Sequence, residues 1–247
     1  MEAAPSAPAE DPLVAGRDKI FSNFVKTMAV GHYQLPSPPS GVMLEFGVGN
    51  ARGYIERYRE HFERAIALDI YDYRSAYPGC EFLFSDGRTI DLPDRSVDFV
   101  ASHSVVEHVE DIGRSLDEIS RILKIGAWAF LTVAPLYYCY DGGHWGSQTQ
   151  QWEHLDPESR FYTPIGQRDL NGLTVPELLR HAGRQPWRIA VMERSAYPVQ
   201  MPDHIKARIP DLLAKGQVCP VDFFTREFRL LVQKTFDLVD GDIRFQN

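Results

Sequence analysis

The stretch Glu45-Phe46-Gly47-Val48-Gly49 holds the residues best suited to binding a small molecule. An apolar run from Val42 ends on an acid, and two glycines alternate before an amphipathic segment begins at about Ala51. This pattern predicts a strand, a tight turn and a helix, where glycine lets the backbone approach a ligand and the helix start offers unpaired N–H groups. A carboxylate at Glu45 would repel a dinucleotide's pyrophosphate, so it favours a ligand with a cationic end.

Alternating apolar and amphipathic segments predict the elements that would position this turn. We expect strands over 42–46, 65–68, 81–84, 96–102 and 127–134, with helices over 51–62 and 112–123. A helix over 175–181 and strands over 187–192 and 227–234 follow. This alternation is typical of an α/β domain with a parallel sheet covered by helices, in which ligands bind beyond the carboxyl ends of the strands.

The chain of 247 residues is long enough for one domain with a sizeable core. Residues 1–15 are rich in alanine, proline and acid and predict a disordered tail, so the domain is expected over 16–247. Apolar spacing over 17–33 predicts an N-terminal helix that packs on the domain or covers its mouth. Two long segments, about 137–173 and 195–223, are expected to be insertions on the substrate side.

Composition argues against several classes of protein. The net charge is −8 and no long basic cluster occurs, which disfavours nucleic acid as a partner. No apolar run is long enough for a membrane span, and the start lacks the features of a secretory signal. Cys80, Cys139 and Cys219 are widely spaced and odd in number, which fits reduced thiols in the cytoplasm. No pattern indicates an oligomeric state.

Five motifs, taken in order, resemble those of class I S-adenosylmethionine-dependent methyltransferases, in particular the methyltransferase type 11-like kind. They cover about residues 40 to 135 and comprise the turn at 45–49, Ala67-Leu68-Asp69, Phe84-Ser85-Asp86-Gly87, residues 92–111 and residues 121–127. The resemblance implies a Rossmann-like, doubly wound sheet of seven mostly parallel strands with a final antiparallel strand. It also implies S-adenosylmethionine as cofactor and S-adenosylhomocysteine as product, which agrees with the cationic ligand favoured by Glu45.

The resemblance also assigns roles to residues. Asp69 would hold the ribose hydroxyls and Asp86 would accept a hydrogen bond from the adenine amino group. The complete predicted cofactor-binding set is Glu45, Gly47, Val48, Gly49, Asp69, Asp86, Gly87, His103 and Ser104. The chain departs from the family pattern at Ala51, where many members have glycine, and at Ile125, where proline is frequent.

Glu107-His108 resembles a pair in the ubiquinone-pathway O-methyltransferases, where an acid three residues earlier helps to hold a divalent metal. Ser104 occupies that position here, and a hard cation binds weakly when a carboxylate is lost. We therefore expect no metal, and expect Glu107 and His108 to cap and orient the following helix.

The aromatic segment after the fifth strand is expected to meet the methyl acceptor. Methylation of a hydroxyl requires removal of its proton, for which histidine is suited near neutral pH. His144, oriented by Asp141, is the first candidate base, followed by His154 beside Glu153, and then His103. The predicted substrate-binding residues are Tyr137, Tyr140, Asp141, Trp145 and Trp152, whose aromatic rings would equally form a small satellite core under a long loop.

The sequence thus predicts an O-methyltransferase for a small-molecule or sugar acceptor in a biosynthetic pathway. Carbon and nitrogen acceptors stay open. Two alternatives are a catalytically inactive cofactor-binding or regulatory protein of the same fold, and an NAD-dependent oxidoreductase.

Overall fold

A computed structural model describes residues 41–50, 53–145, 151–196, 200–214 and 218–236. These residues belong to one compact unit, which begins at Gly41. The expected tail over 1–15 and the expected helix over 17–33 lie outside the described residues. No helix in the described ranges combines the length and the hydropathy that a membrane crossing requires.

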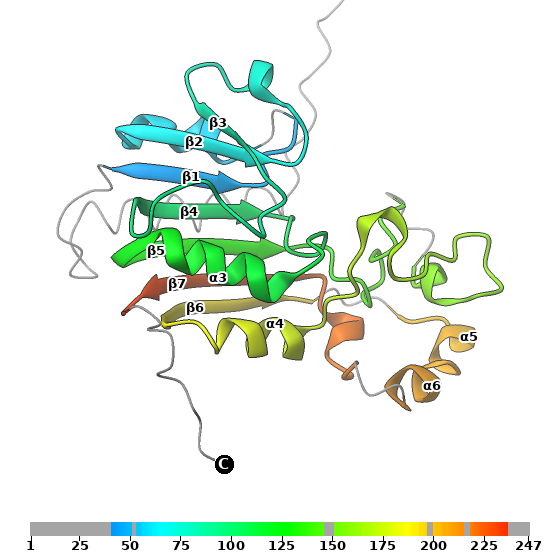
Figure 1. Cartoon of the computed structure of the whole chain (residues 1–247). Helices are drawn as coiled ribbons and strands as arrows, with labels where there is room; N and C mark the ends of the chain where they lie inside the picture. The colour runs from blue at the N-terminus through cyan, green and yellow to red at the C-terminus, as the bar shows by residue number, and fades with distance from the viewer. Residues whose placement is uncertain (1–40, 51–52, 146–150, 197–199, 215–217, 237–247) are drawn as a thin grey trace, which may run out of the picture. The chain divides into compact units, whose positions relative to one another are not determined.

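Seven strands form one sheet, and their order is β3-β2-β1-β4-β5-β7-β6 (Figure 1). All neighbouring pairs from β3 to β5 are parallel, whereas β7 is antiparallel to both β5 and β6. The predicted fold class is therefore confirmed. The strands are β1 (Val42–Phe46), β2 (Arg64–Asp69), β3 (Glu81–Phe84), β4 (Val97–His103), β5 (Leu123–Val133), β6 (Trp187–Ser195) and β7 (Glu227–Lys234).

Helices α3 (Ile112–Ile122) and α4 (Val175–Ala182) lie side by side on one face of the sheet (Figure 1). The N-cap of α3 is Asp111, whose carboxylate accepts a hydrogen bond from the Arg114 N–H at 2.9 Å. The prediction that Glu107 and His108 cap this helix is therefore wrong. The insertion after β6 contains two short helices that the sequence did not predict, α5 (Asp203–Lys206) and α6 (Ile209–Ala214).

The first helix is much shorter than the predicted 51–62. Helix α2 spans only Ile55–Tyr58, and a 3₁₀ turn, Arg59–His61, follows it. Its first N–H groups, those of Tyr54 and Ile55, donate to the Glu45 carboxylate at 2.8 and 2.6 Å. The carboxylate at the end of β1 thus sets where the helix begins.

Strand β5 starts at Leu123, four residues earlier than predicted. Gly126 has a φ of +84° and interrupts the regular extension, yet the chain continues as a strand with a register shift against β4. Glycine adopts this left-handed conformation without strain, so it produces a bulge instead of ending the strand.

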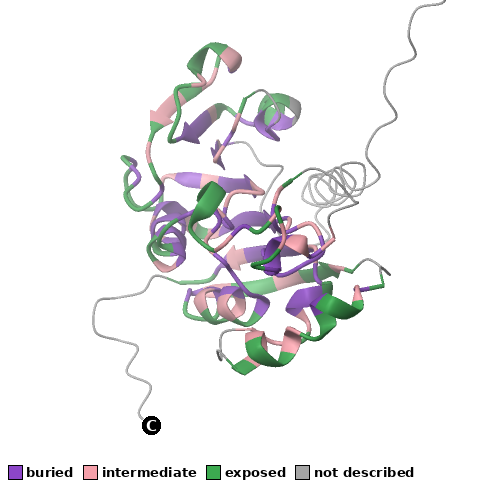
Figure 2. Cartoon of the chain, turned by 90° about the vertical axis from the view of Figure 1, so that its right-hand side faces the viewer, coloured by how far each residue is buried: buried purple, intermediate pink, exposed green. Residues whose placement is uncertain are grey.

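The described residues include two apolar clusters that organise the domain. The larger joins the strands of the sheet to α3 and α4, and the central strands are largely buried (Figure 2). The smaller, which we call the aromatic cluster, joins the two insertions and consists of Tyr137, Tyr138, Tyr140, Trp152, Leu155, Leu170, Met201, Ile205 and Phe223. The aromatic cluster therefore gives the insertions a core of their own.

Candidate functional site

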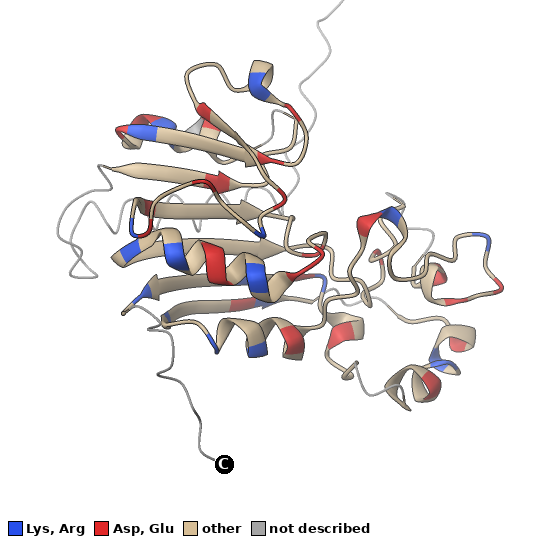
Figure 3. Cartoon of the chain, in the orientation of Figure 1, with Lys and Arg blue, Asp and Glu red and all other residues tan. Residues whose placement is uncertain are grey.

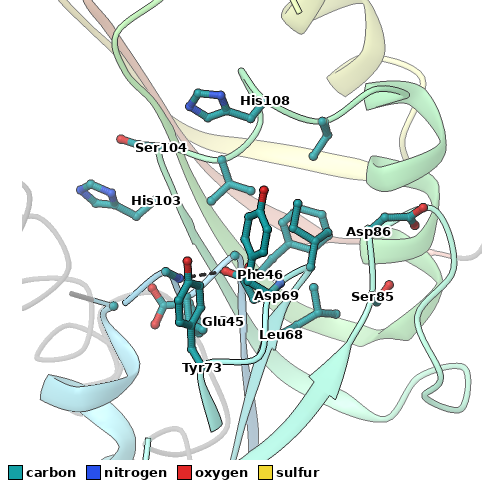
Figure 4. Close-up of a pocket in the computed structure, with 18 of the residues that line it drawn as sticks. Glu45, Phe46, Leu68, Asp69, Tyr73, Ser85, Asp86, His103, Ser104 and His108 are labelled. Atoms are coloured by element: carbon teal, nitrogen blue, oxygen red, sulfur yellow. Dashed lines mark hydrogen bonds between the residues drawn. The ribbon is translucent and has the colours of Figure 1, made fainter. Parts of the chain in front are cut away.

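A cavity of about 630 Å³ opens at the carboxyl ends of β1, β2 and β4 (Figure 4). Its wall includes the turn after β1, the residues that follow β2 and β3, and loop residues 168 and 169. Strand order reverses between β1 and β4, and a doubly wound sheet binds its ligand where this reversal occurs.

The turn after β1 needs its two glycines for different reasons. Both have positive φ, +78° at Gly47 and +60° at Gly49. A Cβ on Gly47 would lie 2.3 Å from a Val105 methyl, whereas a Cβ on Gly49 would meet no described atom within 4 Å. Gly47 thus allows the turn to pack on the loop after β4, and Gly49 keeps the backbone open to a ligand.

Glu45 lies in the wall of the cavity and is fully buried. Burial raises the pKa of Glu45 to about 8, although the N–H groups of Ile55 and Tyr54 act in the opposite direction. A cation entering the cavity would stabilise the ionised carboxylate. Glu45 therefore combines a structural role at the start of α2 with an affinity for positive charge.

Asp69 joins the end of β2 to the glycine turn. Its Oδ2 accepts from the Gly49 N–H at 2.9 Å, and its Oδ1 accepts from the Tyr71 N–H at 3.0 Å. Each carboxylate oxygen has a further lone pair, so the side chain can still accept a hydroxyl from a ligand in the cavity. Ile70, Tyr71 and Tyr73, which the sequence analysis did not select, form the apolar wall next to Asp69.

Asp86 lines the cavity but is held by a neighbour. Arg88 Nη2 lies 2.7 Å from its Oδ2, and this hydrogen bond lowers the pKa of Asp86. Arg88 also contacts Glu110 at 2.8 Å. Gly87 is absent from the described wall of the cavity, contrary to prediction, because it packs on Phe46: a Cβ there would lie 2.3 Å from the ring.

Three polar residues at and just after the end of β4 lie along another side of the cavity, namely His103, Ser104 and His108 (Figure 4). The His103 ring packs edge-on against Tyr54, with centroids 5.3 Å apart. His108 Nδ1 lies 3.1 Å from the Asp169 carbonyl, and burial lowers the pKa of His108. A neutral His108 that donates from Nδ1 presents Nε2 as a proton acceptor.

His144 stands behind His108, with ring centroids 5.0 Å apart, and is not part of the described cavity wall. Burial, followed by the charge of His108, lowers the pKa of His144 to about 4, which makes it a weak base. The expected partner, Asp141, instead accepts hydrogen bonds from Arg226 Nε at 2.7 Å and Cys139 Sγ at 3.1 Å. The geometry thus contradicts an Asp141–His144 pair acting on a ligand.

His154 is only 1% exposed and belongs to the packing of the insertion. Its Nε2 lies 2.5 Å from the Tyr137 carbonyl, and burial lowers the pKa of His154 to about 4. Glu153, expected beside it, contacts His204 at 3.1 Å. His154 therefore does not reach the cavity.

The predicted substrate-binding residues divide into two groups. Tyr137, Tyr140 and Trp152 are buried in the aromatic cluster, as expected for a small satellite core, and they do not line the described cavity. Asp141 is paired with Arg226, as described above. Trp145 alone of the five is exposed, at 42%, and its Nε1 donates to Thr163 Oγ1 at 2.8 Å.

Arg168 and Asp169 line the cavity, although no sequence pattern distinguished them. Both have left-handed φ values, +54° and +58°, which non-glycine residues adopt infrequently and at an energetic cost. The Arg168 guanidinium lies 4.6 Å from the centroid of the Trp145 ring, and its Nη2 donates to the His144 carbonyl at 2.8 Å. The loop thus places a cation at the cavity by backbone conformation.

Acids predominate in the described wall of the cavity. Figure 3 shows acidic residues at the carboxyl ends of β1 and β2. Five acids and two arginines contribute to the wall: Glu45, Asp69, Asp86, Glu110 and Asp169, with Arg88 and Arg168. This balance favours a ligand with cationic groups and hydroxyl donors over a polyanion.

Comparison with known proteins shows that part of the chain is similar to methyltransferases. Residues 44–131 match the family model described as a methyltransferase domain. The chain is 30% identical over 147 residues to a Mycolicibacterium smegmatis protein described as an S-adenosylmethionine-dependent methyltransferase, covering 57% of this chain and 51% of the relative. It is 30% identical over 136 residues to a malonyl-acyl-carrier-protein O-methyltransferase of Yersinia pestis, covering 53% of this chain and 45% of that one.

The crystal structure of an S-adenosylmethionine-dependent methyltransferase from Mesorhizobium loti shares the fold. Its TM-score is 0.53 at 18% identity, with 84% of this chain and 97% of that one covered. The chain spans about half the length of the curated relatives it matches.

Proposed function

We propose that this chain, whose residues 44–131 match the methyltransferase domain model, is a class I S-adenosylmethionine-dependent methyltransferase that methylates an oxygen of a small-molecule or sugar acceptor. The observation that carries the proposal is the cavity at the strand ends, where an open glycine turn meets two buried carboxylates, Glu45 and Asp69. The O-methyltransferase among the relatives supports oxygen as the accepting atom.

The cavity residues suit S-adenosylmethionine, the cofactor of this family. Asp69 has lone pairs for ribose hydroxyls. Asp86 can accept a hydrogen bond from an adenine amino group while it also accepts one from Arg88. Glu45 supplies the negative charge that complements a sulfonium or ammonium group. Gly47, Val48, Gly49, His103 and Ser104 complete the wall on which the cofactor would lie.

When bound, the cofactor supplies a methyl group already activated by its sulfonium, so much of the rate would come from alignment. The chain's contribution is to orient the acceptor and to take its proton. We assign His108 Nε2 as the atom that accepts the proton of the acceptor's hydroxyl. The Asp169 carbonyl accepts a hydrogen bond from Nδ1–H, so Nε2 is unprotonated in the neutral ring. His103 is the other histidine of the cavity wall and is the alternative candidate for the base.

The first test separates the methyltransferase from an NAD-dependent oxidoreductase. Isothermal titration with S-adenosylhomocysteine and with NAD should give the tighter binding for S-adenosylhomocysteine, because the acidic wall repels pyrophosphate. Tighter NAD binding would contradict the proposal.

The second test separates the enzyme from an inactive binding or regulatory protein of the same fold. Labelled methyl transfer from S-adenosylmethionine should be measured on a panel of hydroxyl, carboxylate and amine acceptors, with the His108→Gln and His103→Gln variants beside wild type. We expect transfer to an oxygen and a loss of turnover in His108→Gln with cofactor affinity retained. Tight cofactor binding without transfer to any acceptor would favour the inactive protein.

We also place the chain in the cytoplasm. Cys80, Cys139 and Cys219 are all free thiols, and reduced cysteines are typical of that compartment. Labelling of the thiols in freshly lysed cells without reductant would test this proposal, because oxidised cysteines would not react.

A further inference from the structure

Arg168 differs from the other cation of the cavity wall. Arg88 is neutralised by two carboxylates, Asp86 at 2.7 Å and Glu110 at 2.8 Å. Arg168 forms no ion pair with any residue that the structure describes. One of its five N–H donors binds the His144 carbonyl, which leaves a planar fork of donors for another partner.

The loop holds this guanidinium in place before any ligand arrives. The Trp145 ring supports its face at 4.6 Å, the His144 carbonyl fixes one edge, and two successive left-handed residues, Arg168 and Asp169, direct the backbone. Such backbone strain concentrates at functional sites, and a side chain ordered in advance loses less entropy when it binds.

We propose that Arg168 is the specificity-determining residue that binds an anionic group, a carboxylate or a phosphate, on the methyl acceptor. Arginine suits this role because its fork matches the oxygens of both groups in bidentate geometry. The position also fits, because the carbonyl of Asp169, the next residue, lies 3.1 Å from Nδ1 of His108 on the side of the cavity formed by the end of β4. This inference rests on the proposed function, because the anionic ligand is a methyl acceptor only if the chain is a methyltransferase.

Asp169 lies next to Arg168 in the cavity wall and carries the opposite charge. It would weaken the binding of an anion by repulsion, and so restrict the site to ligands that the arginine can reach directly. Removal of this charge in Asp169→Asn should therefore tighten anion binding, which is opposite in sign to the effect of losing Arg168.

The test measures anion binding to the full chain saturated with S-adenosylhomocysteine. Malonate, inorganic phosphate and the neutral isostere malonamide serve as probes, and their binding is measured by calorimetry. We expect malonate or phosphate to bind while malonamide does not, and the tighter of the two anions identifies the group. Arg168→Gln should raise the dissociation constant at least tenfold, and Asp169→Asn should lower it.

Arg160→Gln is the matched control, since Arg160 also stacks on an aromatic ring, Phe161, at 4.6 Å but lies outside the described cavity wall. Equal binding of malonate and malonamide, or equal losses in Arg160→Gln and Arg168→Gln, would overturn the inference. Failure of S-adenosylhomocysteine to bind would instead contradict the proposed function, and the same anion titration on the unsaturated chain would still decide the role of Arg168.

Discussion

The turn after β1 and the aromatic segment after β5 both follow a strand at its carboxyl end, yet they use their polar groups in opposite ways. Beside the turn, Glu45 of β1 and Asp69 of β2 accept hydrogen bonds from backbone N–H groups and still line the cavity. In the segment, Asp141 is bound by Cys139 and Arg226, His154 lies within hydrogen-bond distance of the Tyr137 carbonyl, and neither forms part of the described wall.

The difference follows from what holds each region. Parallel strands already fix the turn, so its carboxylates remain available to a ligand. The aromatic segment has no such frame, because it runs far beyond the sheet and must order itself around the aromatic cluster. In a long loop with its own core, the large side chains pack in that core and are not available to a ligand.

The largest effect should come from breaking the core of the insertions. Trp152→Ala is expected to lower the free energy of unfolding by about 3–5 kcal/mol, because it removes a ring that is 1% exposed. Urea denaturation measures the change. Trp145→Ala is the control at an exposed site and should cost less than about 1 kcal/mol. If Trp152→Ala left stability unchanged but abolished acceptor binding, the two regions would not differ as described.

Loss of the Asp69 carboxylate should be the next largest effect. Asp69→Ala removes the acceptors of the Gly49 and Tyr71 N–H groups, and we expect the dissociation constant of S-adenosylhomocysteine to rise by about 10- to 100-fold. Calorimetry gives the constant directly. Asp72→Ala, at an exposed position three residues away, should leave it unchanged. An affinity equal to wild type in Asp69→Ala would separate this carboxylate from the cofactor.

Glu45 should give the domain a characteristic pH dependence. Its folded pKa, about 8, lies above the ordinary value of 4.5, so the folded state holds the proton more tightly than the unfolded state. The resulting stability is complete below pH 4.5 and is lost as pH rises toward 8, with a slope of up to about 1.4 kcal/mol per pH unit. The difference in unfolding free energy between wild type and Glu45→Gln isolates this slope, and a difference that is flat from pH 5 to 8 would refute it.

The smallest effect is expected at His144. Because its pKa is about 4 and it is not part of the described cavity wall, His144→Gln should change turnover by less than about twofold. Initial rates with labelled cofactor measure this. A fall of a hundredfold, with unchanged affinity for S-adenosylhomocysteine, would restore His144 as the base.

The sheet could be predicted because its signals are local. The predicted strands over 42–46 and 227–234 match β1 and β7 residue for residue. The start of the first helix could not be predicted, since a carboxylate nine residues earlier in the chain caps it. Contacts between distant residues decide such boundaries, and periodicity carries no information about them.

The candidate site shows the same division. Glu45, Asp69 and Asp86 could be placed at one edge from the order of the strands, and the structure brings them to one cavity. Arg168 could not be found, because its position depends on two left-handed residues in a long loop and on a ring contributed by Trp145. The buried state of His154 was equally hidden, since it depends on the fold of the insertion.

The aromatic cluster has a consequence for protein engineering. Its members come from both insertions: Trp152 and Leu170 lie in the first, while Met201 and Phe223 lie in the second. A chimaera that receives only one insertion from a relative would join half of one core to half of another. Grafting a new acceptor preference onto this domain therefore requires the two insertions to be exchanged together, as a single inherited module.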